Sequence, residues 1–275
     1  TALKRPADEE VLTVNGASQN NYPFDDFHVL IGMMPALVHP EPRRAMALGL
    51  GVGSTPYGLA VDPRLDEITT VELCGGELEL LDGLADRGAF ELRRFFHDPR
   101  QHVVVGDGRD HLLRLEDTYD VIVIDTLRAQ AAFSGSLYSV EFYELLSEHL
   151  SDDGIIAQWA PSPRVVNSIT EVFPHAVRFY VPEYYNSPFI VASKAPIDLD
   201  RGALLERFAA ERPMFDHDQA DRLEQYIASA EAECLLDGTA RPGVPGDALN
   251  RDLWPRDEYF LNQPVDVAER AAACG

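Results

Sequence analysis

The chain contains few basic residues. Its 275 residues include 46 aspartates and glutamates but only 23 arginines and lysines, which gives a formal net charge of −23, and Lys4 and Lys194 are the two lysines. Binding of duplex nucleic acid needs a basic face that neutralises phosphates, so this balance argues against a nucleic-acid partner. The same acidity would attract a cationic substrate, and it equally suits solubility or a salty cytoplasm.

Cysteine and long apolar runs are also scarce. No apolar run approaches the roughly 18 residues of a membrane span, and residues 1–10 are too polar for a secretory signal, so we expect no membrane insertion by this chain. Cys74, Cys234 and Cys274 are odd in number and lack the spacing of metal ligands. They predict no metal site and favour a reducing, cytoplasmic location.

Short apolar segments alternate with helical patterns over the middle of the chain. Apolar residues at helical spacing predict a helix over 26–38. Strands are predicted at 45–50, 68–73, 103–105, 121–125, 155–159 and 189–192, with helices near 75–85, 108–115, 139–150 and 164–172. This alternation predicts an α/β fold with a parallel sheet covered on both faces.

The two ends differ from the middle. Val11–Val14 alternate into Asn15-Gly16, which predicts an N-terminal β-hairpin. Residues 199–235 carry the pattern of two acidic amphipathic helices. The last segment is expected to pack on the core through the apolar residues Leu253, Trp254, Tyr259 and Phe260.

We therefore expect three parts. Residues 1–38 would form the hairpin and the first helix, and residues 39–196 a Rossmann-like domain. Residues 197–275 would form an acidic helical extension.

A glycine turn is the clearest functional signal. An apolar strand runs into Gly49, Gly51 and Gly53, and Glu72 ends the next strand. Glycine lets the chain turn tightly and lets a ligand approach the backbone, while a carboxylate one strand later can accept both hydroxyls of a ribose. The pair predicts a site for an adenosine-containing cofactor, and a nicotinamide-dependent dehydrogenase would share both features.

Two further acids fall at predicted strand ends, where ligands of such sheets bind. Asp107 lies between Gly106 and Gly108 and could accept a hydrogen bond from the amine of adenine. Asp125 closes the apolar strand that begins at Tyr119, where a carboxylate is costly unless it is paired or used. Each acid could also be a helix cap or turn residue. A dehydrogenase leaves Asp107 and Asp125 unexplained.

The motifs follow a recognisable order along the chain. They are Asn15-Gly-Ala-Ser-Gln19, Phe27-His28, His39-Pro-Glu-Pro42, Gly49-Leu-Gly-Val-Gly53, Val71-Glu-Leu73, Asp98-Pro-Arg100, Gly106-Asp-Gly108, Tyr119–Asp125, Leu137-Tyr138, Phe142-Tyr143 and Gly154-Ile-Ile-Ala-Gln158. This series resembles the spermidine synthase family of aminopropyltransferases, especially its divergent bacterial branch. The resemblance implies a Rossmann-like sheet of the class I S-adenosylmethionine-dependent transferases and assembly into dimers or tetramers.

The resemblance also implies a reaction. A primary amine attacks the aminopropyl group of decarboxylated S-adenosylmethionine, and Asp125 accepts the proton. The implied cofactor-binding residues are Gly49, Gly51, Gly53, Glu72, Asp107 and Gly108, and the implied substrate-binding residues are Gln19, His28, Arg128, Tyr138 and Gln158.

Two positions depart from the family. Val52 stands where the cofactor loop has an aspartate, and Arg128 replaces the second acid of the catalytic loop. Both changes weaken attraction for ammonium groups, and Arg128 would favour a carboxylate. Polyamine specificity is therefore not predicted, and the partner could be a small amine or an amino-acid-like molecule.

Several functions stay open as a result. The chain could transfer an aminopropyl-type group to an amine. It could instead use intact S-adenosylmethionine for aminocarboxypropyl or methyl transfer or for intramolecular cyclisation. A further alternative is a non-catalytic nucleoside-sensing domain attached to a membrane transporter.

Overall fold

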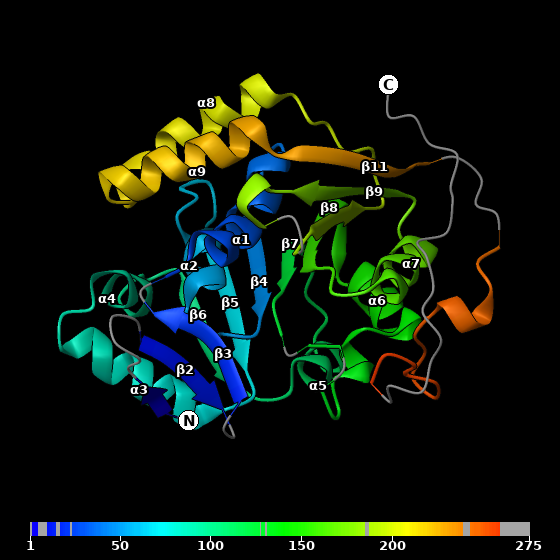
Figure 1. Cartoon of the computed structure of the whole chain (residues 1–275), viewed down its shortest axis with the longest axis horizontal. Helices are drawn as coiled ribbons and strands as arrows, with labels where there is room; N and C mark the ends of the chain where they lie inside the picture. The colour runs from blue at the N-terminus through cyan, green and yellow to red at the C-terminus, as the bar shows by residue number, and fades with distance from the viewer. Residues whose placement is uncertain are drawn as a thin grey trace.

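A computed structural model describes residues 2–4, 10–14, 17–22, 24–126, 128–129, 131–184, 187–238 and 243–258. The described residues form an eight-stranded sheet in the order β11-β9-β10-β8-β7-β4-β5-β6 (Figure 1). Its strands are β4 (Arg44–Leu48), β5 (Glu67–Glu72), β6 (Gln101–Val105), β7 (Tyr119–Ile124), β8 (Leu150–Trp159), β9 (His175–Tyr180), β10 (Phe189–Ser193) and β11 (Glu231–Asp237).

The N-terminal β-hairpin is confirmed. Strand β2 (Glu10–Val14) pairs antiparallel with β3 (Ala17–Tyr22), and β1 (Ala2–Lys4) adds a third strand to this small sheet. The helices that follow are α1 (Asp26–Val38), α2 (Ser54–Ala60), α3 (Gly75–Asp86), α4 (Phe90–Phe96), α5 (Gly108–Leu113), α6 (Val140–Glu148), α7 (Pro163–Val172), α8 (Arg201–Glu211) and α9 (His217–Ser229).

The expectation of a wholly parallel sheet is wrong at one edge. Strands β8, β7, β4, β5 and β6 are parallel neighbours. Strand β10 runs antiparallel to both β8 and β9, because the short connection from β9 holds no helix long enough for a crossover.

The second correction concerns the C-terminal helical pattern. Both expected helices are present as α8 and α9, but residues 231–237 form β11 instead, which pairs antiparallel with β9. The first three residues of β11 are exposed and two of them are acidic, so the strand lacks the apolar alternation that identifies a strand. Because β11 joins the main sheet, the expected extension is continuous with the core there, and the domain boundaries stay a prediction.

Side chains of the central strands alternate between two packed layers. Ala47, Val121 and Val123 belong to the layer that also contains the apolar faces of α1, α2, α8 and α9. Met46 and Ile122 belong to the opposite layer, with α5, α6 and α7. This alternation follows from the two-residue period of a strand and yields three layers, with the sheet in the middle (Figure 1).

Polar contacts anchor the segment that follows Gly243. Asp252 and Asp257 lie 2.6 and 3.3 Å from arginines of α5 and α7, respectively. The expectation that apolar residues dock this segment is wrong for Leu253 and Trp254, which are 86% and 68% exposed. Tyr259 and Phe260 lie outside the described residues.

Candidate functional site

The strand order reverses between β4 and β7. From β4 the chain moves outward through β5 and β6, and then returns to place β7 and β8 on the other side. Ligands of open α/β sheets bind at the carboxyl ends of the strands at such a switch point. Gly49 follows β4 and Asp125 follows β7, so two predicted site residues lie at this place.

Gly49 and Asp125 are in direct contact. The Asp125 amide donates a hydrogen bond to the Leu48 carbonyl at 3.0 Å. A Cβ on Gly49 would approach the Asp125 carbonyl oxygen closer than the 3.0 Å limit for real Cβ atoms, and Gly49 has φ +98°. Glycine is therefore required where the turn passes the catalytic candidate.

The rest of the turn is glycine-rich but its middle residue faces inward. Gly51 and Gly53 also have positive φ, at 56° and 97°. Val52 is 1% exposed and packs in the core beneath the turn. The valine that replaces the family's acid thus presents no side chain to the ligand edge, so that edge has neither a carboxylate nor an apolar group at this position.

Glu72 and Asp107 follow the neighbouring strands β5 and β6. The buried Glu72 carboxylate accepts hydrogen bonds from the amides of Leu50 at 2.8 Å and Cys74 at 2.7 Å, which ties the glycine turn to the end of β5. The exposed Asp107 caps α5 by accepting from the Asp110 amide at 2.8 Å. Each carboxylate oxygen has two lone pairs, so these bonds leave acceptor capacity for a ligand.

A cluster of polar side chains surrounds Asp125. Its Oδ2 lies 2.7 Å from Nδ1 of His28 on α1, and the Thr55 hydroxyl of α2 donates to the same oxygen. The other ring nitrogen of His28, Nε2, lies 3.8 Å from Oδ2 of Asp25. The side chains of His28 and Asp125 are 20% and 11% exposed. The structure therefore brings together two predicted residues from segments 97 positions apart.

The pKa values of the ionisable groups in this cluster depend on one another. Burial by itself lowers the pKa of His28, but Asp125 and Asp25 outweigh it and raise the pKa to about 9. Burial tends to raise the pKa of Asp125, and the imidazolium of His28 with the Thr55 hydroxyl brings it below its ordinary value. Burial raises the pKa of Asp25. At neutral pH the cluster thus contains a His28–Asp125 ion pair.

Sequence reasoning missed Asp25 and Thr55. Asp25 precedes α1 and its carboxylate accepts from the His28 amide at 3.0 Å, so it resembles an ordinary helix cap. Thr55 resembles a helix-start residue. The available signal was the three-residue spacing of Asp25 and His28, which places both side chains on one face.

Tyr138 and Gln158 lie beside this cluster, and burial together with the nearby Asp125 carboxylate raises the pKa of Tyr138. Both are fully buried among residues of the α6 and α7 layer, and Gln158 accepts a hydrogen bond from the Tyr143 hydroxyl at 2.8 Å. Their role in substrate binding stays a prediction. Gln19 lies in β3, whose side chains are outside the described part of the structure.

Arg128 and Glu77 are the remaining charges near the strand ends. Arg128 is exposed and forms no ion pair with the residues that the structure describes. Glu77 on α3, which the sequence did not identify, is buried, and its Oε1 has no hydrogen-bond partner among the described residues. Burial and the nearby Glu72 carboxylate raise the pKa of Glu77 to about 8.

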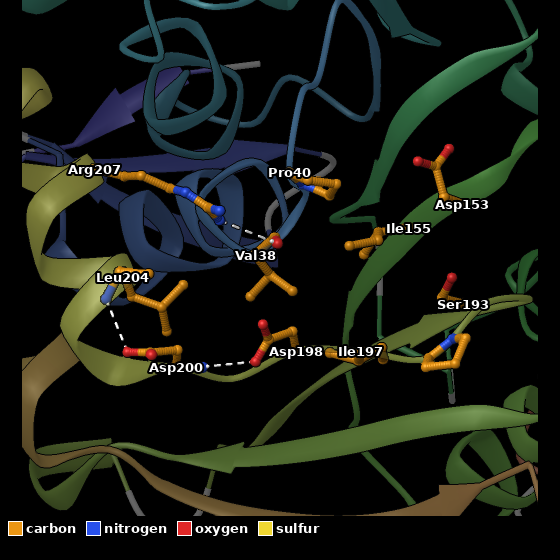
Figure 2. A pocket seen from close by; sticks show the side chains of 12 residues that line it. Val38, Pro40, Asp153, Ile155, Ser193, Ile197, Asp198, Asp200, Leu204 and Arg207 are labelled. Atoms are coloured by element: carbon orange, nitrogen blue, oxygen red, sulfur yellow. Dashed lines mark hydrogen bonds between the residues drawn. The ribbon is translucent and has the colours of Figure 1, made fainter.

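A pocket of about 150 Å³ lies at the opposite end of the strands from this site, near the start of β8 (Figure 2). Arg207 of α8 points across it to the Leu37 and Val38 carbonyls at the end of α1. Asp198 and Asp200 accept hydrogen bonds from backbone amides. These bonds serve the fold, and none of the predicted site residues lines this pocket.

An open groove of about 670 Å³ lies between α4 and the turn after α8, and Tyr57, Phe90, Arg94 and Met214 are among its lining residues. None of the predicted site residues lines it either. Within the described residues, no group of three histidine, cysteine or acidic side chains is arranged to hold a metal ion. No helix of that part is long and apolar enough to cross a membrane.

The cytoplasmic location favoured by the cysteine count stays a prediction.

Comparison with known proteins identifies relatives of this chain. The polyamine aminopropyltransferase of Desulforudis audaxviator is 28% identical over 180 residues, covering 61% of this chain and 64% of the relative. That of Moorella thermoacetica is 29% identical over 189 residues, covering 63% and 65%. The chain therefore matches slightly less than two thirds of the length of these relatives.

Solved structures show the same fold. A spermidine synthase in complex with the transition-state analogue AdoDATO superimposes with a TM-score of 0.60 at 21% identity, covering 72% of this chain and 74% of that one. The mixed sheet of this chain thus has the Rossmann-like fold of that structure. The spermine/spermidine synthase domain matches residues 25–196, from the cap of α1 to the end of β10, and the chain therefore belongs to the spermine/spermidine synthase family.

Proposed function

We propose that this chain transfers an aminopropyl-type alkyl group from the sulfonium of S-adenosylmethionine, or of its decarboxylated form, to an amine. The observation that carries the proposal is the His28–Asp125 ion pair beside the glycine turn at the switch point. Family membership and the AdoDATO complex of a structural relative support it.

The nucleoside would lie across the ends of β4, β5 and β6. The glycine turn offers backbone without side chains, because its two larger residues, Leu50 and Val52, are buried. Glu72 keeps lone pairs for the ribose hydroxyls, and Asp107 with Gly108 stands where the adenine edge would fall. The acids along this edge suit a sulfonium cation.

The reacting end would lie at Asp125. The amine nitrogen forms a bond to carbon, the carbon–sulfur bond breaks, and its electron pair returns to sulfur as a neutral thioether. The amine proton must be taken up, and the His28–Asp125 pair is the proton-accepting system at this place. The residues also align the two substrates.

Product analysis tests this proposal. The protein is incubated with decarboxylated S-adenosylmethionine and a series of diamines, and mass spectrometry follows methylthioadenosine and the alkylated amine. We expect both products from the wild type and a loss of at least 100-fold in rate for Asp125→Asn. Asp86→Asn, at an exposed position of α3, is the matched control and should keep full rate. Absence of product with either form of the cofactor would contradict the proposal.

Arg128 favours a second candidate, the use of intact S-adenosylmethionine. Its exposed guanidinium follows Asp125 by three residues and has no ion-pair partner in the described part of the chain, so it could bind the methionine carboxylate. Calorimetry decides between the two cofactors. Tighter binding of the intact form, reduced about tenfold or more by Arg128→Gln, supports this candidate. Preference for the decarboxylated form with no effect of Arg128→Gln rejects it.

Three family-based expectations belong to the same proposal. The acceptor is a small amine or amino-acid-like molecule, the protein assembles as a dimer or tetramer, and it acts in the cytoplasm. Light scattering tests the assembly and fractionation tests the location. Tight nucleoside binding with no turnover of any amine would favour a nucleoside-sensing domain instead.

A further inference from the structure

The imidazole of His28 is held on both sides by carboxylates. Asp125 faces Nδ1 at 2.7 Å, and Asp25 faces Nε2 at 3.8 Å. The backbone of the same residue is also fixed, since the His28 amide donates to Asp25 and the His28 carbonyl lies 3.2 Å from the Thr55 hydroxyl. These contacts together fix the orientation of the ring.

The contact with Asp125 selects one tautomer of the neutral His28 ring. A carboxylate accepts but cannot donate, so Nδ1 must carry the hydrogen in this 2.7 Å bond. The lone pair of neutral His28 is then on Nε2. Asp25 is too distant from Nε2 for a hydrogen bond, and the side chain is 20% exposed, so this nitrogen is open to an incoming group.

Oδ2 of Asp125 is less suited to take up a proton. Its Oδ2 already accepts from both His28 and Thr55. These contacts hold the pKa of Asp125 below its ordinary value, far from the value near 10 of an alkylammonium ion. The pKa of His28, at about 9, is much closer, and proton transfer is most efficient between groups of similar basicity.

We propose that Nε2 of the neutral His28 ring, which replaces the imidazolium of the ion pair at alkaline pH, accepts the amine proton, and that Asp125, Thr55 and Asp25 are positioning residues that orient the ring. The inference rests on the proposed function and assigns roles within that site. As the amine nitrogen bonds to carbon and the electron pair of the carbon–sulfur bond returns to sulfur, the N–H proton moves to Nε2. The imidazolium is stabilised by Asp125 and later releases its proton to water.

The surroundings of His28 allow this role. Besides Asp25 and Asp125, the ring meets the edge of Phe27 at 5.5 Å, and Tyr184 lies 5.1 Å beyond Phe27. Phe27 is apolar, and burial raises the pKa of Tyr184, so neither competes for the proton at neutral pH. No other charged group of the described residues was found to act on His28.

Nuclear magnetic resonance tests the geometry without turnover. Nitrogen-15 shifts of the His28 ring should show the form with hydrogen on Nδ1 once it is neutral. Asp125→Asn should lower the His28 pKa by at least one unit, whereas the exposed His217 should not change. Hydrogen on Nε2, or an unchanged pKa in Asp125→Asn, would overturn the inference.

Kinetics test the chemical role. His28→Gln keeps a donor toward Asp125 but has no basic nitrogen, so kcat should fall 100- to 10,000-fold with little change in KM, and the rise in rate toward pH 9 should disappear. Asp25→Asn should shift this rise in rate to lower pH, because Asp25 helps to raise the pKa of His28, and should keep most of kcat. A wild type that produces no alkylated amine would refute the proposed function. An active wild type whose pH profile is unchanged in His28→Gln would refute this inference alone.

Discussion

Gly49→Ala should destabilise the protein substantially, because this glycine lies where the cofactor turn passes Asp125. The φ of +98° alone costs an alanine about 1–2 kcal/mol. The added Cβ would also press on the Asp125 carbonyl and would lie 3.1 Å from its carbon, and such overpacking costs about 1–3 kcal/mol. The free energy of unfolding should therefore fall by roughly 2–5 kcal/mol, since the costs concern different atoms.

Urea unfolding followed by circular dichroism measures this change. Gly83→Ala is the matched control, because Gly83 lies within α3 with open space around its Cβ position. Its alanine variant should gain about 0.5–1 kcal/mol, as expected for glycine replaced in a helix. A loss below about 0.5 kcal/mol for Gly49→Ala would refute the tight contact between the turn and Asp125.

Three further predictions concern charge. The pKa of His28 is about 9 in the folded chain and 6.5 for a free side chain. Protonated His28 therefore stabilises the fold by about 3 kcal/mol below pH 6.5, and this stabilisation is lost as the pH rises through 9. Urea unfolding of His28→Gln, measured across this pH range, should lack that decline. The raised pKa of Glu77, about 8, means that its ionisation destabilises the fold as pH rises from 4.5 to 8, by up to about 5 kcal/mol, and Glu77→Gln should remove this loss from the same titration. Asp257→Ala removes the carboxylate that pairs with the buried guanidinium of Arg164, so thermal or urea unfolding should show a loss of about 3–5 kcal/mol, and a loss under 1 kcal/mol would show that the segment after Gly243 is not anchored there.

The sequence predicted the parallel half of the sheet well. Residues 45–50, 68–73 and 121–125 are short apolar runs flanked by glycine or acids, and the structure places β4, β5 and β7 at almost the same positions. Such runs are unambiguous because both faces of a central parallel strand are buried. The acidic edge strand β11 is half exposed and carries no such pattern, so the sequence predicts helix there.

The site was only partly accessible to sequence reasoning. The residues at strand ends, such as Glu72, Asp107 and Asp125, follow from the rule that ligands bind at carboxyl ends. The neighbourhood of Asp125 depends on how α1 and α2 pack over the sheet, which no local pattern encodes. For that reason Thr55 and Asp25 were missed and the inward direction of Val52 was not foreseen.

The two positions at which this chain departs from the family, Val52 and Arg128, differ in their surroundings. Val52 contributes to the core and removes one acid without adding an obstacle at the ligand edge. Arg128 is exposed and follows Asp125 by three residues. Under the proposed function the first replacement removes an attraction for ammonium, and the second would add one for a carboxylate.

A crystal structure with methylthioadenosine bound tests the central claim most directly. The account predicts that the nucleoside lies across the glycine turn at Gly49, with its ribose hydroxyls on Glu72 and its adenine edge at Asp107. The thioether sulfur should face Asp125 and His28. Binding of the nucleoside in the pocket near Arg207, or at the switch point with its sulfur pointing away from Asp125, would contradict the account.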